Sequence, residues 1–156
     1  MDALIAATFT WGFSIFYGLS LIEKSVWPLI FGSKNADVSE ENVRFTHKAL
    51  KRLTPLLPPS NGIVILVGTI LLMRQAWDMN WSIESLVQPV LYVSIMLGIV
   101  LVGRNPAIVF AIRAQDENSP LDEVRKSIRS VGQQHHIALF TNLAVVLYQL
   151  LVIANL

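Results

Sequence analysis

The sequence lacks cysteine, is poor in charged residues and carries no short catalytic signature. Without cysteine, this chain forms no disulfide, offers no thiol nucleophile and ligates no iron–sulfur cluster. Charged residues make up 15% of the 156 residues, whereas a soluble domain of this length carries about 25%. A P-loop, a nucleophile elbow, a Cys/His cluster and a glycine-rich dinucleotide fingerprint are all missing. With 53% hydrophobic residues, the composition indicates a membrane protein.

The charged residues are clustered, and they leave long neutral stretches between them. We predict four membrane spans, at about residues 3–22, 56–73, 86–103 and 137–156, because a stretch of about 20 apolar residues crosses a bilayer. The last stretch contains no charged side chain from Ile137 to Leu156. The predicted fold is therefore all-α: residues 1–156 form one domain, a four-helix transmembrane bundle whose helices extend on the cytoplasmic side.

Lysine and arginine are distributed unevenly between the predicted connections. All of them except Arg74 lie in the connections 23–55 and 104–136, and Lys34 is among them. The positive-inside rule places both basic connections in the cytoplasm and both termini outside. We expect a multi-pass protein of a bacterial inner membrane. The first residues lack the basic region of a cleaved signal peptide, so we expect the first span to be permanent.

The first basic connection contains a predicted amphipathic helix from Glu40 to Thr54. Asp37 and Ser39 are candidate caps for its start, and acidic residues fill its first turn. Basic residues spaced by four share one face of such a helix. The predicted lipid-facing basic patch consists of Arg44, Lys48, Lys51 and Arg52. Because the segment is short and lies beside the membrane, we expect it to contact anionic lipid headgroups and not nucleic acid.

Polar residues from all four spans are predicted to reach the inner end of the bundle. They are Glu23, Asn61, Arg104, His135 and His136. Ionisable groups near hydrocarbon usually face protein or a water-filled cavity and pair with one another. We therefore predict a polar pocket open to the cytoplasm, with a Glu23–Arg104 ion pair inside it. The alternative is that each side chain extends separately to the lipid headgroups.

The two adjacent histidines point about 100° apart on a helix, so we expect one to face inward and the other to face the interface. His135 is the inward candidate, because Asn142 and Gln149 follow it at heptad spacing and would continue a polar stripe inside the bundle. That stripe is either structural, or it includes a histidine that binds a ligand or handles a proton.

A cofactor is permitted by the sequence but not required by it. Candidate cofactor contacts are His135, Asn142, Gln149 and Asn61. His135 is also the candidate metal ligand, and His47 joins it only if its helix folds back. Because the fourth span alone supplies intramembrane histidines, a bis-histidine haem within one protomer is not expected unless His47 takes part.

The segment Gln134-His135-His136-Ile137-Ala138-Leu139-Phe140-Thr141-Asn142, with its arginine-rich lead, resembles the last helix of small four-helix membrane families. They include the anthrone-oxygenase-like group and a second group of small uncharacterised transmembrane proteins. The resemblance covers residues 125–156. In the oxygenase-like group it implies oxidation of small aromatic molecules, either metal-assisted or without a cofactor. It would make His135, His136 and Asn142 the candidate site residues.

Three functions stay open at this point. The first is a non-catalytic membrane subunit or assembly protein, acting as a homo-oligomer or within a larger membrane complex. The second is a small membrane oxidoreductase or oxygenase at the inner mouth of the bundle, for which the catalytic candidates are His135, His136, Glu23 and Arg104. The third is an oligomeric small-molecule transporter. The absence of an acidic residue in mid-membrane argues against proton-coupled transport by one protomer.

Overall fold

The computed structural model describes residues 1–33 and 36–154, and within them the chain is all-α and contains no strand. The elements are α1 (Asp2–Ile22), the 3₁₀ turn η1 (Lys24–Val26), α2 (Trp27–Phe31), α3 (Glu40–Leu53), α4 (Leu57–Asp78), α5 (Ile83–Leu101), α6 (Asn105–Ala114) and α7 (Leu121–Ile153). The predicted helical fold is confirmed. Lys34 and the last two residues of the fourth predicted span lie outside the described residues.

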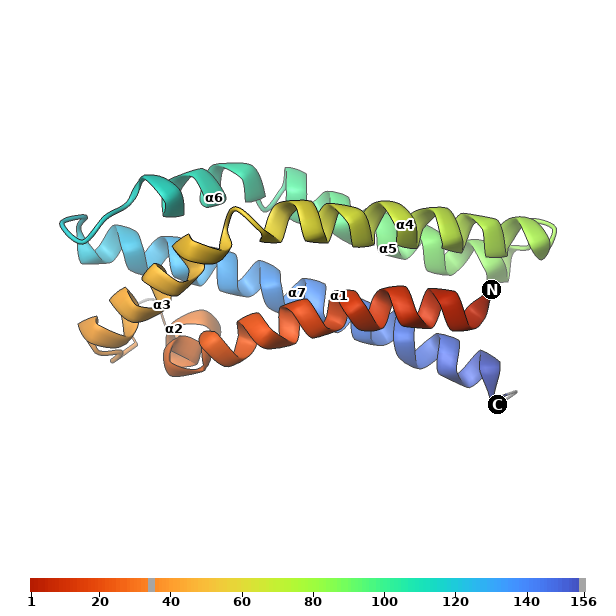
Figure 1. The fold of residues 1–156 in the computed structure, drawn as a ribbon, viewed down its shortest axis with the longest axis horizontal. Helices are drawn as coiled ribbons and strands as arrows, with labels where there is room; N and C mark the ends of the chain where they lie inside the picture. The colour runs from red at the N-terminus through yellow and green to blue at the C-terminus, as the bar shows by residue number, and fades with distance from the viewer. Residues whose placement is uncertain (34–35, 155–156) are drawn as a thin grey trace.

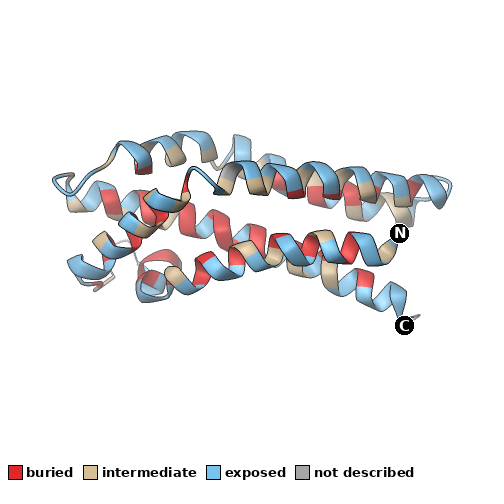
Figure 2. Cartoon of the chain, viewed as in Figure 1, coloured by how far each residue is buried: buried red, intermediate tan, exposed pale blue. Residues whose placement is uncertain are grey.

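The long helices lie side by side along the long axis of the molecule (Figure 1). The start of α1, the α4–α5 turn and the end of α7 are at one end, whereas α2, α3, α6 and the first half of α7 are at the other. The most extensive helix pair is α1 with α7, which run in opposite directions. Buried residues line the inward faces of these helices, and the outward faces are exposed (Figure 2).

Three helices are long and apolar enough to cross a membrane: α1, α4 from Pro59 and α7. The pair α5 and α6 would supply a fourth crossing only as one broken span, since it is bent by 43°. The break falls at Arg104, whose backbone is left-handed with φ of 51°, and Pro106 follows it at the start of α6. The chain is thus consistent with a multi-pass membrane protein.

Helix α7 is continuous from its charged beginning to its apolar end. Its 33 residues measure about 50 Å at 1.5 Å per residue, so it is longer than the roughly 30 Å hydrocarbon layer of a bilayer. At Gly132 the short helix α2 packs directly on it, and an added Cβ there would lie 2.5 Å from Ile30 Cδ1. The absence of a side chain at Gly132 allows α2 to pack closely over the middle of α7.

Helix α3 begins as expected, and its cap is Ser39, whose hydroxyl accepts a hydrogen bond from the Asn42 amide at 3.3 Å. Helix α4 continues to Asp78, beyond the predicted end of the second span at residue 73. An Arg74–Asp78 ion pair at 3.0 Å spans this last turn. The chain then turns at Asn80 and Trp81, both with positive φ.

Candidate functional site

The centre of the site is a buried pair formed by Glu23 and His135. Glu23 caps the end of α1 and is 0% exposed, and its Oε1 lies 2.6 Å from Nδ1 of His135 on α7. A buried carboxylate is costly unless hydrogen bonds or an opposite charge compensate it. Because a carboxylate oxygen accepts, His135 donates its Nδ1 proton to Glu23. This bond fixes the plane of the imidazole and leaves its Nε2 edge available.

His136 has its own hydrogen-bond partners, separate from the Glu23–His135 pair. Its Nδ1 donates to the Gly132 carbonyl at 2.8 Å, and its Nε2 lies 3.1 Å from the Ser20 hydroxyl. Phe31 packs edge-on against the imidazole with ring centroids 4.5 Å apart. His136 is buried, so the expectation that it faces the interface is wrong. Because the chain folds back through α2 after α1, it covers this face of α7.

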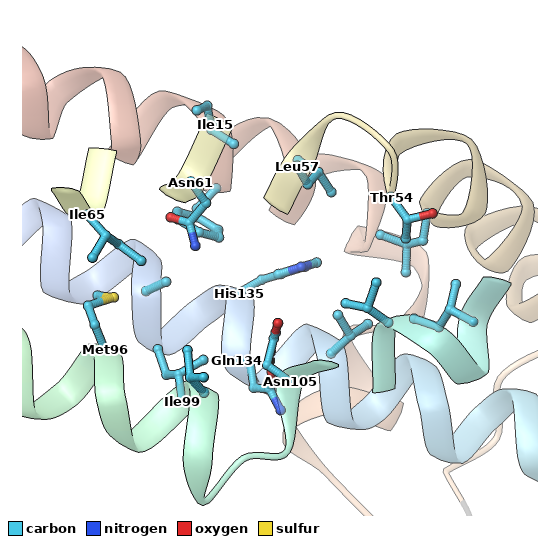
Figure 3. Close-up of a pocket in the computed structure, with 17 residues that line it drawn as sticks. Ile15, Thr54, Leu57, Asn61, Ile65, Met96, Ile99, Asn105, Gln134 and His135 are labelled. Atoms are coloured by element: carbon cyan, nitrogen blue, oxygen red, sulfur yellow. Dashed lines mark hydrogen bonds between the residues drawn. The ribbon is translucent and has the colours of Figure 1, made fainter. Parts of the chain in front are cut away.

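A cavity of about 70 Å³ lies beside His135. Figure 3 shows the histidine pointing into it, with Asn61 and Leu57 on one side and Asn105 and Gln134 on the other. Its remaining walls are mainly aliphatic. Helices α1, α3, α4, α5, α6 and α7 all contribute to the lining. A cavity of this size holds a few waters or a similarly small molecule, whereas an engineered cavity of about 150 Å³ accommodates benzene.

The polar wall opposite α4 is fixed by the break between α5 and α6. The amide of Gln134 donates to the Gly103 carbonyl at 2.7 Å, and its oxygen accepts from Asn105 Nδ2, also at 2.7 Å. The first bond satisfies a backbone carbonyl at the end of α5, and the second holds the side chain of Asn105 against α7. His135 Nε2 itself makes no hydrogen bond to any described residue. The site therefore presents one free imidazole nitrogen to a cavity bordered by amides.

The predicted Glu23–Arg104 ion pair is wrong. Arg104 is exposed, and no salt bridge within the described residues involves it. Its left-handed conformation at the α5–α6 break goes with a side chain outside the bundle. Glu23 is paired with His135, and its Oε2 is 3.7 Å from His136 Nδ1, which is too long for a hydrogen bond.

The inward stripe of His135, Asn142 and Gln149 is confirmed, since all three are buried. Only His135 reaches the cavity, however. Asn142 packs against Gly12, where an added Cβ would be 2.5 Å from its Oδ1. Gln149 lies further along α7 and hydrogen-bonds to Gln75 and Gln88 of neighbouring helices. As cofactor candidates, Asn142 and Gln149 are therefore not brought together with His135, whereas Asn61 is.

His47 is buried because α3 does fold back on the bundle, but it does not line the cavity. Its neighbours Leu50 and Thr54 do. Burial lowers the pKa of His47 below its ordinary value of 6.5, a contact with the Ile112 backbone opposes that shift, and Lys51 and Arg44 add to it. Within the described residues no group of three or more His, Cys, Asp or Glu side chains is arranged to hold a metal ion.

The predicted basic patch on α3 faces acidic neighbours. Arg44 pairs with Glu40 at 2.7 Å, Lys48 lies 3.7 Å from Glu117, and Lys51 donates to the Gln115 carbonyl at 2.5 Å. Arg52 is exposed. Arg44 and Lys51 are thus hydrogen-bonded within the protein, whereas Lys48 and Arg52 remain exposed.

Sequence reasoning missed Gln134, Asn105 and Thr54 as cavity residues. The position of Gln134 directly before the histidine pair was the one sequence signal that could have placed it near the cavity. Comparison of the chain with protein-family models, with curated proteins and with solved structures finds no match. The geometry of the site alone therefore supports the function proposed below.

Proposed function

We propose that the protein is a four-span integral membrane protein that works by binding, and that a small hydrogen-bond donor occupies the cavity beside His135. The observation that carries this proposal is the 2.6 Å bond from Nδ1 of His135 to the fully buried Glu23, which directs the other imidazole nitrogen at the cavity. A hydroxyl or amide N–H of the ligand donates to that nitrogen. The side chains of Asn61 and Asn105 supply further polar contacts.

In this proposal α5 and α6 together form the fourth span, and the bundle has its basic end in the cytoplasm. The site then lies near the inner interface, where a polar ligand enters from the cytoplasm. The protein acts as a non-catalytic subunit or an assembly protein. Ligand binding at its internal site stabilises one packing of the helices. A reporter fused after Leu156 tests the orientation, because a cytoplasmic reporter signal would contradict it.

The binding site is tested with small alcohols as probes. We expect ethanol to shift the imidazole Hε1 resonance of His135 saturably in protein reconstituted in lipid nanodiscs. Ala138 is 3% exposed and lines the cavity, so Ala138→Leu should fill the space and remove the shift without replacing either residue of the Glu23–His135 pair. Ala144→Leu is the matched control, because Ala144 is exposed on the same helix. A shift that survives Ala138→Leu, or one absent from the wild type, contradicts the proposal.

A small membrane oxidoreductase or oxygenase is the second candidate function. The Glu23–His135 pair favours it, since an imidazole oriented by a carboxylate can take a proton from a substrate. The size of the cavity opposes it for aromatic substrates, because about 70 Å³ is roughly half the volume that accommodates benzene. An absorption spectrum and metal analysis of the purified protein separate the two, because a haem band or stoichiometric metal would replace the binding proposal with this one.

A further inference from the structure

A second polar groove lies on the outside of the molecule, between α2 and the first half of α7. It has a volume of about 520 Å³ and is separate from the His135 cavity. Residues from successive turns of one face of α7 line it, among them Lys126, Arg129, Ser130 and Gln133. Arg125 and Asp122 contribute the other charges, so the groove holds three basic side chains and one acidic side chain.

The cations of this groove keep free donors. Arg129 donates from Nη1 to the Leu29 carbonyl at 3.2 Å, which anchors the guanidinium and leaves most of its five N–H groups unused. Gln133 is anchored in the same way on the Ile30 carbonyl at 3.1 Å. Lys126 is exposed and makes no hydrogen bond or ion pair with the residues that the structure describes. Arg129 and Lys126 therefore keep free donors, although Arg125 is bound by the Ala36 and Val38 carbonyls and Asp122 supplies one carboxylate to the groove.

The groove lies at the edge of the apolar surface. One turn after Gln133 on the same helix, the exposed residues become apolar, with Ile137 at 49% and Phe140 at 61% exposure. The short helix α2 on the other side exposes Trp27 and Phe31. Aromatic side chains are enriched at the headgroup level of membranes. Donors that border such a surface are at the depth where lipid phosphates lie.

The basic patch on α3 does not offer the same site. Its groove is lined by Arg44, Lys48, Lys51 and Arg52 together with the acids Glu41, Asp116 and Glu117. Four basic and three acidic side chains leave an excess of one positive charge there, against two in the α2–α7 groove. Lys48 is also close to Glu117. Anionic headgroups therefore favour the α2–α7 groove.

We infer that the α2–α7 groove binds the phosphodiester headgroup of an anionic phospholipid, with the acyl chains lying along Ile137 and Phe140. Arg129, Ser130 and Gln133 contact the phosphate oxygens, and Lys126 neutralises the charge. This site rests on the proposed membrane-spanning arrangement but not on the ligand at His135. It moves the lipid contact predicted for α3 to a different helix.

The test is native mass spectrometry of the full-length, delipidated protein in detergent, titrated with phosphatidylglycerol or with phosphatidylcholine of the same acyl chains. The wild type is expected to bind the first phosphatidylglycerol more tightly than phosphatidylcholine. Lys126→Gln should weaken the first phosphatidylglycerol about fivefold, the factor that corresponds to roughly 1 kcal/mol per basic residue near an anionic surface. Arg52→Gln is the matched control with the same change of charge, and we expect less than a twofold effect.

Equal binding of the two lipids, or an equal effect of Arg52→Gln and Lys126→Gln, would overturn the inference. Displacement of the lipid by inorganic phosphate at equal concentration would overturn the assignment to a lipid headgroup. Lys126→Gln should keep the ethanol-induced shift at His135. If lipid selectivity is absent while that shift is intact, only the lipid site in the groove is refuted. If the protein fails to insert into bilayers, the proposed membrane-spanning function is refuted instead.

Discussion

The carboxylate of Glu23 and the imidazole of His135 meet at 2.6 Å although 112 residues separate them in the chain. Glu23 ends the first long helix, and His135 lies in the middle of the last. Their bond therefore sets how α1 and α7 are aligned along each other. It also decides which edge of the histidine faces the cavity, so one contact links the packing of the bundle to its candidate site.

Replacing Glu23 with glutamine tests how much this contact stabilises the fold. Glu23→Gln keeps the size of the side chain but removes the charge, and its amide can present a donor to His135 Nδ1. We expect the free energy of unfolding to fall by about 1–3 kcal/mol, the usual cost of an impaired buried hydrogen bond. Thermal unfolding in detergent measures it, with Glu41→Gln as an exposed control. If both variants melt together, the buried pair does not stabilise the bundle.

Two glycines of α1 provide a matched pair for testing the α1–α7 contact. An added Cβ at Gly12 lies 2.5 Å from Asn142 Oδ1 and 2.8 Å from Val64 Cγ1, whereas nothing lies within 4 Å of one at Gly18. Gly12→Ala should therefore destabilise the protein by about 1–3 kcal/mol through overpacking. Gly18→Ala should be neutral or stabilising, because alanine favours helix. Chemical unfolding of both variants checks this, and the reverse order would contradict the close packing of α1 on α7.

The glutamine cluster at the far end of the bundle should show measurable coupling. Gln75 and Gln149 exchange two hydrogen bonds of 3.2 Å, and Gln149 also donates to Gln88 at 3.0 Å. A double-mutant cycle of Gln75→Leu and Gln149→Leu should give a coupling energy of about 0.6–1.7 kcal/mol, the range for hydrogen bonds between membrane helices. The pair Gln75→Leu and Thr141→Val is the control, because Thr141 bonds only within its own helix. Equal coupling energies in both cycles would show that the hydrogen bonds between Gln75 and Gln149 do not stabilise the bundle.

His47 makes the docking of α3 dependent on pH. Burial lowers its pKa in the folded protein, so between that value and 6.5 the unfolded state binds more protons. The neutral histidine therefore contributes its full stability above pH 6.5, and this contribution is lost as the pH falls below it. Hydrogen exchange of α3 amides, corrected for intrinsic rates, should show less protection at pH 5.5 than at pH 7.5. His47→Gln should remove most of this difference, and a wild type with pH-independent protection would contradict it.

Much of the helical fold was predictable, because apolar stretches and helix caps are local signals. Each predicted span overlaps one of the helices α1, α4, α5 and α7, although α7 begins at Leu121, well before the predicted start at residue 137. Ser39 caps α3 as predicted. The heptad spacing of His135, Asn142 and Gln149 also correctly predicted one buried face. These features depend on apolar stretches, capping residues and the helical period, all of which are local properties of the sequence.

The partners across helices were not predictable in the same way. Depth along the spans placed Glu23 and Arg104 at one level, yet depth contains no information on rotation about the helix axis. The left-handed residue at the α5–α6 break and the return of the chain through α2 decide that rotation. The left-handed residue and the return of the chain both arise from tertiary packing, such as the contact of Ile30 with Gly132. No periodic pattern in the sequence encodes this packing. His136 was misplaced for the same reason.

The tautomer of His135 shows whether Glu23 orients the imidazole toward the cavity. Nitrogen NMR of histidine-labelled protein in lipid nanodiscs distinguishes a protonated from an unprotonated ring nitrogen. At a pH where His135 is neutral, we expect Nδ1 to carry the proton, hydrogen-bonded to Glu23, and Nε2 to carry the lone pair. Glu23→Ala should shift this tautomer balance, whereas Glu41→Ala should leave it unchanged. A wild-type His135 protonated at Nε2 and unprotonated at Nδ1 would refute the proposed site, because the cavity would then face a donor and Glu23 would not direct the ring.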